Sequence, residues 1–205
     1  MLKKINIASI ILISLFTLIT ILTLTKQTDE VNRFLQSLIQ SLETPFLTVF
    51  LKIISNLSEW FIYIPVAILL IIIPDLRWKF GIPAAITLTV SAALNALLKN
   101  IFAVPRPDVN RLIEITGFGF PSGHAMNSAA FIGIITLLFI CRSSEKSHRI
   151  TASVLAVLFI LAIGFSRIYL GVHSPADVIA GYAMGLFLSL CALICTLRAT
   201  LKIAS

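Results

Sequence analysis

The sequence predicts an all-α, polytopic membrane protein: a six-helix transmembrane bundle with amphipathic interfacial helices between the first and second spans. Composition is the first observation behind this prediction. The 205-residue chain is 58% hydrophobic and 12% charged, with a mean hydropathy of +1.01, whereas a soluble domain usually carries about twice that charged fraction. The second observation is that the apolar residues gather into runs close to the length that crosses a bilayer, about 20 residues. The length fits one domain, residues 1–205.

Six apolar runs are candidate spans. We place them at roughly 5–25, 59–74, 80–102, 122–141, 150–166 and 176–197. The second run is short for a span. The first could instead be a signal peptide, because Lys3 and Lys4 precede it, but it is long for one and no small-x-small cleavage site precedes Lys26. We therefore expect an uncleaved anchor.

Residues 28–43, between the first two spans, have the pattern of an amphipathic helix with Thr28 as a candidate N-cap. Its apolar face comprises Val31, Phe34, Leu35, Leu38, Ile39 and Leu42. We expect this helix to lie on the membrane surface or to pack on the outer end of the bundle, and the two arrangements are compatible. Residues 45–57 are apolar but too short to span comfortably, so we expect a second interfacial or partly buried helix there.

The net charge of +7 does not indicate a nucleic-acid partner, because the cations lie in short loops between apolar runs and not in one solvated patch. We expect the lipid bilayer as the surroundings and no obligatory protein partner. The cysteines, Cys141, Cys191 and Cys195, have no metal-ligand spacing with a histidine. We therefore expect them to be buried small hydrophobic side chains, and we expect no metal site.

The distribution of Lys and Arg predicts the orientation, because basic residues accumulate in cytoplasmic loops. One set of span ends carries nine: Lys3, Lys4, Arg77, Lys79, Arg142, Lys146, Arg149, Arg198 and Lys202. The opposite set carries four besides Lys99, Arg106 and Arg167, namely Lys26, Arg33, Lys52 and Arg111. We therefore expect a multi-pass protein of the cytoplasmic membrane with both termini in the cytoplasm.

Three cations fall at the outer ends of the predicted spans. Lys99 ends the third span and shares a helix face with Ser91 and Asn95, a polar stripe that should face the bundle and not lipid. Arg106 lies in a proline-bracketed turn, and Arg167 begins the last outer loop. Arginine binds two phosphate oxygens at once. A single such cation is more often a headgroup contact, but three beside two histidines indicate an anion site.

Pro121-Ser122-Gly123-His124 begins the fourth span. Serine is a favoured N-cap, and a helix N-terminus with a glycine offers free backbone N–H groups to an anion. An ordinary capped helix start explains Ser122 and Gly123. It does not explain His124, which shares an inward-facing helix face with Asn127 and Ser128.

His173 and Asp177 follow Arg167 in the loop into the sixth span. Ser174 resembles an N-cap, with Pro175 at the first helical position, and Asp177 could close a capping box. Asp177 could therefore have a purely structural role. The functional interpretation is that its carboxylate holds the imidazole of His173 in one tautomer, which leaves the other nitrogen free to attack.

In this order, Lys99-x6-Arg106-Pro107, Pro121-Ser122-Gly123-His124 and Ser166-Arg167-x5-His173-x3-Asp177 resemble the three-part signature of the type 2 phosphatidic-acid phosphatase superfamily. Every position of the signature is filled. The motifs cover about residues 99–177, and the six-span layout extends the resemblance to nearly the whole chain. The sequence looks most like the small bacterial members that dephosphorylate phosphatidylglycerol phosphate or undecaprenyl diphosphate.

The resemblance implies a metal-independent lipid phosphatase without a cofactor. It would act at the outer membrane face on phosphatidylglycerol phosphate, phosphatidic acid or undecaprenyl diphosphate. His173 would form a phosphohistidine, Asp177 would orient it, and His124 would protonate the leaving oxygen and then activate water. The phosphoryl oxygens would be held by Lys99, Arg106, Ser122, the Gly123 amide and Arg167.

Other functions stay open on the sequence alone. A lipid A phosphatase of the same superfamily would use the same motifs. Vanadium haloperoxidases share the signature, but they are soluble and much larger, so six spans argue against them. A non-catalytic membrane protein or a transporter would need the cations to bind an anion, but not His124, His173 and Asp177 together.

Overall fold

The computed structural model describes residues 2–204, with side chains for residues 3–199, and this part of the chain is helical without strands. The all-α prediction is therefore confirmed. The elements in order are α1 (Leu2–Leu24), α2 (Asp29–Gln40), α3 (Pro45–Asn56), α4 (Trp60–Ile72), α5 (Pro74–Leu76), the π-helical turn η1 (Arg77–Gly81), α6 (Ile82–Phe102), α7 (Gly123–Arg142), α8 (Lys146–Tyr169) and α9 (Pro175–Ala204).

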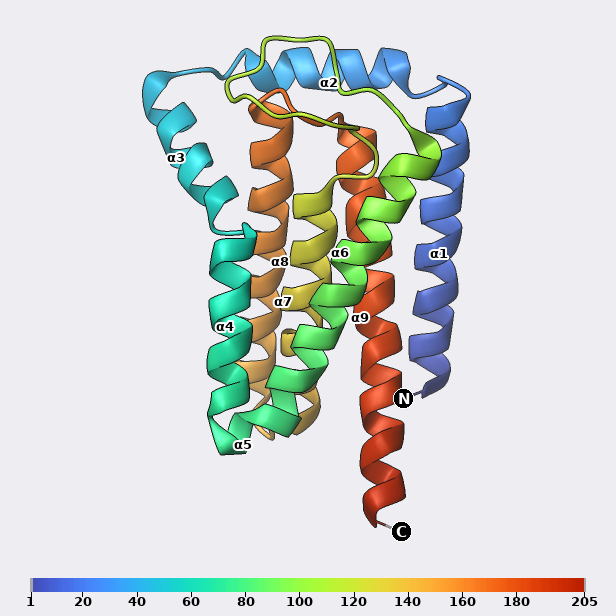
Figure 1. Cartoon of the computed structure of the whole chain (residues 1–205), viewed down its shortest axis with the longest axis vertical. Coiled ribbons are helices and arrows are strands. Elements are labelled where there is room, and N and C mark those ends of the chain that lie inside the picture. Colours follow the sequence, from blue (N-terminus) through green and yellow to red (C-terminus); the bar gives the residue numbers. More distant parts are fainter. Residues whose placement is uncertain (1, 205) are drawn as a thin grey trace.

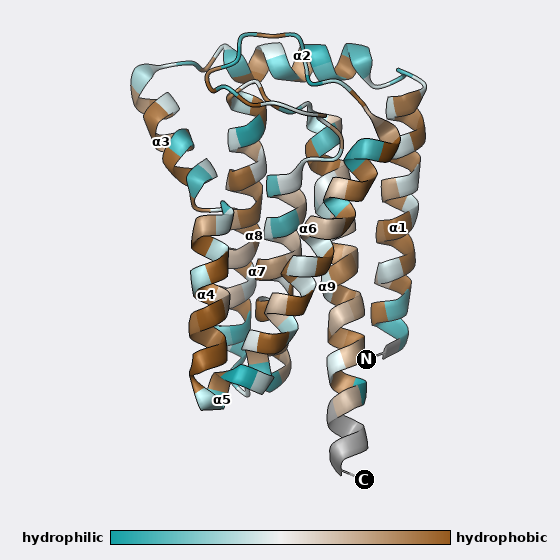
Figure 2. Ribbon diagram, in the orientation of Figure 1, coloured by the Kyte–Doolittle hydropathy of each residue, from teal (hydrophilic) through white to brown (hydrophobic). Residues whose placement is uncertain are grey.

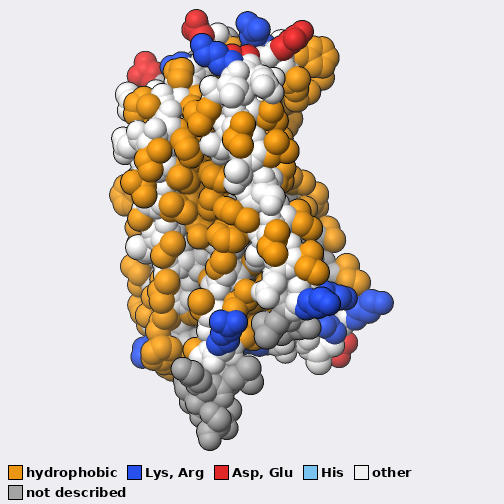
Figure 3. All heavy atoms as spheres, turned by 90° about the vertical axis from the view of Figure 1, so that its right-hand side faces the viewer, with side chains coloured by type: hydrophobic (Ala, Val, Ile, Leu, Met, Phe, Trp, Pro, Cys, Tyr) orange, Lys and Arg blue, Asp and Glu red, His pale blue; other side chains and the backbone are white. Residues whose placement is uncertain are grey.

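The long helices stand side by side and α2 lies across one end of them (Figure 1). Helix α7 is central and packs against α6, α8 and α9, while α1 packs against α9. Within the described part of the chain, five helical segments are long and apolar enough to cross a membrane: Lys3–Leu24, Pro74–Phe102, Gly123–Arg142, Lys146–Tyr169 and Pro175–Ala199. Between its two ends the bundle is mostly hydrophobic, and charged side chains gather at the ends (Figures 2 and 3). This is the surface expected of a helix bundle surrounded by lipid.

The second crossing differs from the sequence prediction. We expected a span at 59–74 and a separate interfacial helix at 45–57, but α4 is only 13 residues long. Helices α3 and α4 follow one another from the α2 end of the bundle to the opposite end (Figure 1). Two short helices with a break at residues 57–59 thus cover the distance that the neighbouring helices cover in one piece. At 1.5 Å rise per residue, 13 residues reach only about 20 Å, which is too short for a span of about 30 Å.

The remaining predicted spans coincide with helices, with ends that differ by a few residues. The largest consequence concerns Arg167, which lies in the last turn of α8 and not in the outer loop. Helix α8 ends just before Gly171, which has a left-handed backbone at φ 74°. Glycines in this conformation commonly end helices, so the last turn of α8 includes Arg167. Cys141 and Cys195 are exposed and Cys191 is half-buried. The expectation that they are buried is therefore wrong, since the lipid-facing side of a span also accepts small apolar side chains.

Helix α2 forms where the amphipathic pattern predicts it, but a polar stripe of α2 faces the protein. Gln36 is 2% exposed, Asn32 accepts a hydrogen bond from the Ala176 N–H (3.1 Å), and Gln40 donates to the Asn110 carbonyl (2.7 Å). Apolar side chains of the same helix, Val31, Phe34 and Leu38, are exposed. An interfacial helix at the rim can turn this apolar edge toward lipid while its polar stripe covers the bundle end. Thr28 stands at the N-cap position without a side-chain capping bond.

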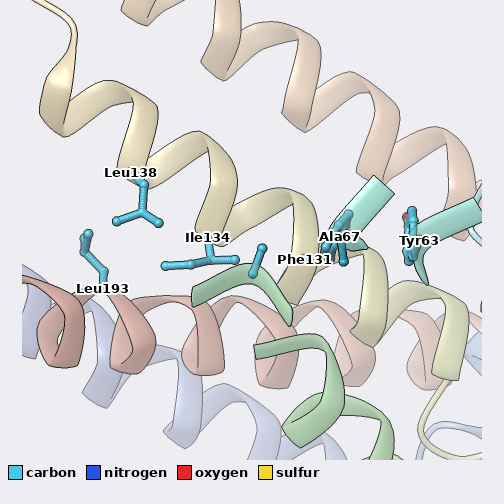
Figure 4. Close-up of a cluster of buried hydrophobic side chains, with 7 residues drawn as sticks. Tyr63, Ala67, Phe131, Ile134, Leu138 and Leu193 are labelled. Atoms are coloured by element: carbon cyan, nitrogen blue, oxygen red, sulfur yellow. The ribbon is translucent and has the colours of Figure 1, made fainter. Parts of the chain in front are cut away.

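Two of the apolar clusters among the described residues fix α7 in the bundle. The first joins α4, α7 and α9 through Tyr63, Phe131, Ile134, Leu138 and Leu193 (Figure 4). The second lies nearer the α2 end and joins α1, α7 and α9 to the loop before α7: its buried members are Phe16, Phe120, Met126, Ala180, Ala183 and Met184. Both clusters include α7, so the helix that begins with the Ser122-Gly123-His124 segment is fixed along its whole length.

Glycines on α9 allow its close approach to α7. A Cβ added at Gly181 would lie 3.0 Å from the Ala125 Cβ, and one at Gly185 would lie 2.8 Å from the Ala129 Cβ and closer still to the Met126 carbonyl oxygen. Small residues at such positions let two helix backbones meet in a membrane. Because the neighbouring atoms at Gly185 include backbone, they cannot move aside as a flexible side chain can.

We predict that Gly185→Val lowers the free energy of unfolding in detergent by about 1–3 kcal/mol or more, the range typical of an overpacked core. Thermal unfolding of the purified variant measures this change. The matched control is Cys195→Val, on the exposed side of the same helix, which should stay within about 0.5 kcal/mol of the parent. Equal stability of the two variants would contradict the close contact between α7 and α9.

Candidate active site

The three sequence motifs meet at the end of the bundle that α2 covers. The long segment between α6 and α7 crosses this end (Figure 1), and backbone hydrogen bonds join it to the α8–α9 loop and to the first turn of α9. The Leu112 N–H donates to the Leu170 carbonyl (3.1 Å), and the Ser122 N–H donates to the Asp177 carbonyl (3.0 Å). Residues separated by as many as 78 positions in sequence therefore contribute to one site, from Lys99 on α6 to Asp177 on α9.

His173 and Asp177 form a buried pair. His173 is 1% exposed, and its Nδ1 lies 3.4 Å from Asp177 Oδ2. This separation allows an ionic interaction but is longer than an ordinary N–H···O hydrogen bond, and Nδ1 makes no hydrogen bond. On the opposite edge of the ring, Nε2 lies 3.3 Å from Nη1 of Arg106. The nitrogen away from the carboxylate therefore faces a guanidinium.

Asp177 also caps its own helix. Its Oδ2 accepts the Ser174 N–H (2.8 Å), and its own N–H donates to Ser174 Oγ (3.2 Å). The structural and the functional interpretation of Asp177 are thus compatible, because one carboxylate oxygen closes the capping box and also faces His173. The cap fixes the side chain that in turn faces the imidazole.

The surroundings of His173 favour its neutral form. Burial lowers the pKa of His173 well below the usual 6.5, and the charges of Arg167, Lys99 and Arg106 lower it further. The sign follows from the charge of the acid form: a buried imidazolium beside three cations is disfavoured twice. The ring is therefore neutral around pH 7, and its Nε2 carries a lone pair that faces Nη1 of Arg106.

Arg106 joins the loops around His173. Its Nη1 donates to the Val172 carbonyl (2.8 Å), Nε donates to the Gly117 carbonyl (3.0 Å), and Nη2 donates to the Thr116 carbonyl (3.1 Å). One guanidinium thus holds both the segment before α7 and the backbone beside the histidine. The planar fork of arginine allows this arrangement, which a lysine could not reproduce.

Lys99 and the polar stripe on α6 face the bundle, as the sequence predicts. Lys99 Nζ donates to the Phe118 carbonyl (2.8 Å), Asn95 Nδ2 donates to the Pro121 carbonyl (3.2 Å), and Ser91 donates to Asn127 Oδ1 (2.7 Å). A Cβ at Gly123 would lie 2.9 Å from Asn95 Oδ1. The glycine therefore lets the start of α7 sit directly against α6.

Two buried polar groups at the site have hydrogen-bonding capacity that the protein does not use. Arg167 is 2% exposed. Its Nη1 donates to Ser55 Oγ, but Nε and Nη2 have no partner. The hydroxyl of Ser122 is fully buried without a partner, and it makes no capping bond to α7. Unpaired buried polar groups are costly, so these donors indicate an anion that the site is built to receive.

His124 pairs with a residue that sequence reasoning missed. Its Nε2 lies 2.9 Å from Glu59 Oε1, and Glu59 is located at the break between α3 and α4. The same break brings Ser55 to Arg167. One signal could have identified Glu59, because it is the sole acidic residue between Glu43 and Asp75. Its partner could not be read from the sequence.

A cavity of about 570 Å³ adjoins the site on the side of α2. Arg106 and Asp177 line it together with Asn32 and Gln36 of α2 and Lys26. Neither His124 nor His173 lines this cavity. Within residues 2–204, no group of three or more His, Cys, Asp or Glu side chains is placed to hold a metal ion.

The sequence matches the PAP2 superfamily over residues 80–201. Among curated proteins, phosphatidylglycerophosphatase B of Bacillus subtilis is 39% identical over 100 residues, 46% of this chain and 47% of the relative. Undecaprenyl-diphosphatase of Sulfolobus acidocaldarius is 34% identical over 142 residues, 66% of this chain and 64% of the relative. The matched stretches thus cover less than two thirds of either relative.

The fold has a solved counterpart. The crystal structure of a transmembrane PAP2-type phosphatidylglycerolphosphate phosphatase from Bacillus subtilis superimposes with a TM-score of 0.85, covering 93% of this chain and 96% of that one at 22% identity. At this identity the likeness establishes the fold alone. The family match covers more than half of the chain and includes all three motifs and every residue from Lys99 to Asp177 that meets at the bundle end. The chain therefore belongs to the PAP2 superfamily.

Proposed function

We propose that this protein is a membrane lipid phosphatase that works through a phosphohistidine. The observation that carries the proposal is the neutral, buried His173 beside the unpaired donors of Arg167 and Ser122. A nucleophile and a set of anion-binding donors in one place suit phosphoryl transfer, which needs mainly positioning and charge stabilisation.

In the proposed first step, the lone pair on Nε2 of His173 attacks phosphorus in line. A P–N bond forms as the bond from phosphorus to the leaving oxygen breaks, and His124 gives its proton to that oxygen. Asp177 stabilises the positive charge that develops on the His173 ring, since its Oδ2 is 3.4 Å from Nδ1.

In the second step, His124 takes a proton from water as the water oxygen attacks the phosphohistidine. The P–N bond breaks, inorganic phosphate leaves, and both histidines return to their starting states. General acid–base assistance of this kind contributes about 10²–10⁴-fold.

The phosphoryl oxygens are held, in this proposal, by groups on four different segments. Lys99 comes from α6, Arg106 from the following loop, Ser122 and the Gly123 amide from the start of α7, and Arg167 from α8. These are cations and donors, where a two-metal phosphatase would use several carboxylates. We therefore propose catalysis without a metal or other cofactor.

The substrate class follows from the site's position and from the relatives' names. The relatives are named for phosphatidylglycerol phosphate and undecaprenyl diphosphate, and the site lies at one end of an apolar bundle. A lipid can bring its phosphate there while its tail stays in the bilayer. Phosphate release from phosphatidylglycerol phosphate, phosphatidic acid, undecaprenyl diphosphate and a lipid A 1-phosphate, compared by kcat/KM, selects among the candidates.

The central test is His173→Ala. The variant should fold normally and lose turnover by a factor of at least about 10⁴, because without the nucleophile the two-step route is closed. Phosphate release and thermal unfolding in detergent measure the two properties. A well-folded variant that still turns over at a substantial rate would refute the assignment of His173 as nucleophile.

Metal removal and vanadate give an independent test. Activity should be unchanged in excess EDTA, because lysine and arginine hold the oxygens. Vanadate should inhibit competitively, because its trigonal-bipyramidal adduct resembles the transition state of phosphoryl transfer. Loss of activity in EDTA with recovery on adding Mg²⁺ would show that a metal takes part.

We also propose that the site faces the outside of the cell. The N-terminal end of α1 and the C-terminal end of α9 lie at the end of the bundle opposite the site (Figure 1). The same end carries the larger group of nine basic residues named above. Lys202 is one of these, and its side chain lies outside the described residues.

Single cysteines test this orientation. In a chain lacking Cys141, Cys191 and Cys195, we predict that a membrane-impermeant thiol reagent labels Asn110→Cys in intact cells but not Ser144→Cys. Both positions are exposed, and they lie in loops at opposite ends of the bundle. Labelling after cell lysis is the control for reactivity. The reverse pattern would place the site in the cytoplasm.

A further inference from the structure

The side chain of Glu59 contacts His124 on another helix and does not cap its own helix. Glu59 is the N-cap residue of α4, where an acidic side chain ordinarily bonds to its own helix. It makes no such capping bond. Its Oε1 instead lies 2.9 Å from Nε2 of His124, on α7. Residues that break a local rule in favour of a distant contact are concentrated at functional sites.

The register between α4 and α7 is fixed one turn further along. The Tyr63 hydroxyl donates to Ser128 Oγ (2.8 Å), and both side chains are buried. Tyr63 is four residues after Glu59, and Ser128 is four residues after His124. Two cross-helix bonds at the same spacing hold the carboxylate opposite the imidazole.

The pair lies near His173, because the charges of Arg167 and Lys99 act on both histidines. Arg167 connects them: its carbonyl accepts the His173 N–H (3.3 Å), and its Nη1 bonds to Ser55, four residues before Glu59. Because Nε2 of His124 faces Glu59, Nδ1 is the ring nitrogen that can give a proton to a substrate or take one from water. Across the described residues, the structure records no hydrogen bond to that atom.

We propose that Glu59 is a positioning residue for His124. The carboxylate accepts the Nε2–H, which fixes the tautomer and the ring orientation and stabilises the imidazolium. In the acid step the Nδ1–H bond breaks and the proton goes to the leaving oxygen. In the base step Nδ1 takes a proton from the attacking water while Nε2–H stays with Glu59. This inference rests on the proposed function, and it adds a second histidine–carboxylate pair to the one formed by His173 and Asp177.

The test compares leaving groups that differ in their need for an acid. The quantity is kcat/KM, which includes only the steps up to phosphorylation, for short-chain phosphatidic acid and for 4-nitrophenyl phosphate. Glu59→Gln keeps a hydrogen-bond acceptor but removes the charge. We expect it to lower the lipid value about tenfold to hundredfold, within the about 10²–10⁴-fold that a general acid contributes, and to leave the aryl value within about threefold.

Two variants serve as references. His124→Ala should show the same selectivity for the alkyl leaving group with a larger loss. Tyr63→Phe loosens the same contact between α4 and α7 without touching His124, so it should affect the two substrates equally. If Tyr63→Phe reproduces the pattern of Glu59→Gln, or if Glu59→Gln affects both substrates equally or neither, Glu59 only holds the helices together and the inference is wrong.

A pH profile gives a readout that a merely structural role would not change. The charged and titratable groups around His124 are Glu59 at the α3–α4 break, Arg167 on α8, Lys99 on α6 and His173. Among them only Glu59 carries negative charge, so Glu59→Gln should shift the high-pH loss of lipid turnover to a lower pH than in the parent. An unchanged profile would overturn the inference. Failure of the proposed function is distinguishable, because the parent protein would then release no phosphate from any lipid.

Discussion

The cost of placing charge in an apolar bundle governs how this molecule is arranged. An ionisable side chain inside a membrane protein must be paired, hydrogen-bonded or placed at the rim. Here the cations of the candidate site lie at one end, where carbonyls of loop residues can accept their hydrogen bonds. Arg106 bonds to three such carbonyls and Lys99 to one. Arg167 is the exception, with two donors left unpaired, and the chemistry we propose depends on that exception.

The same cations act on the histidine beside them. Burial and three neighbouring positive charges favour the neutral form of His173. In the mechanism we propose, Asp177 stabilises the charge that develops when the ring attacks phosphorus. An anionic substrate suits this arrangement. In the mechanism we propose, a phosphate accepts from the unpaired donors of Arg167 and offsets the repulsion among the cations.

Two features between α1 and α4 contribute to the site: helix α2 and the break between α3 and α4. Helix α2 covers this end of the bundle with a polar stripe and leaves an apolar edge exposed. The break between α3 and α4 brings Ser55 to Arg167 and Glu59 to His124. A continuous span would place a helical backbone at that point and would direct those side chains by helical geometry alone. The interruption of the second crossing is thus the feature that equips the site on the side of His124.

The sequence by itself determined the helical class, the positions of five spanning segments and the residues that gather at the site. Apolar runs must cross a membrane as helices because no other backbone structure satisfies its hydrogen bonds there, and polar residues in such runs must turn inward. Only the tertiary structure decided which neighbours they meet. The periodicity of a sequence shows that one face of a helix is polar, but not whether that face contacts a loop, lipid or another helix. The inward-facing polar stripe of α2 and the division of the second crossing into α3 and α4 therefore could not be predicted. The contact between Glu59 and His124 joins residues 65 positions apart and depends on the register of α4 against α7. That register is a property of side-chain packing between helices, and no local pattern in the sequence encodes it.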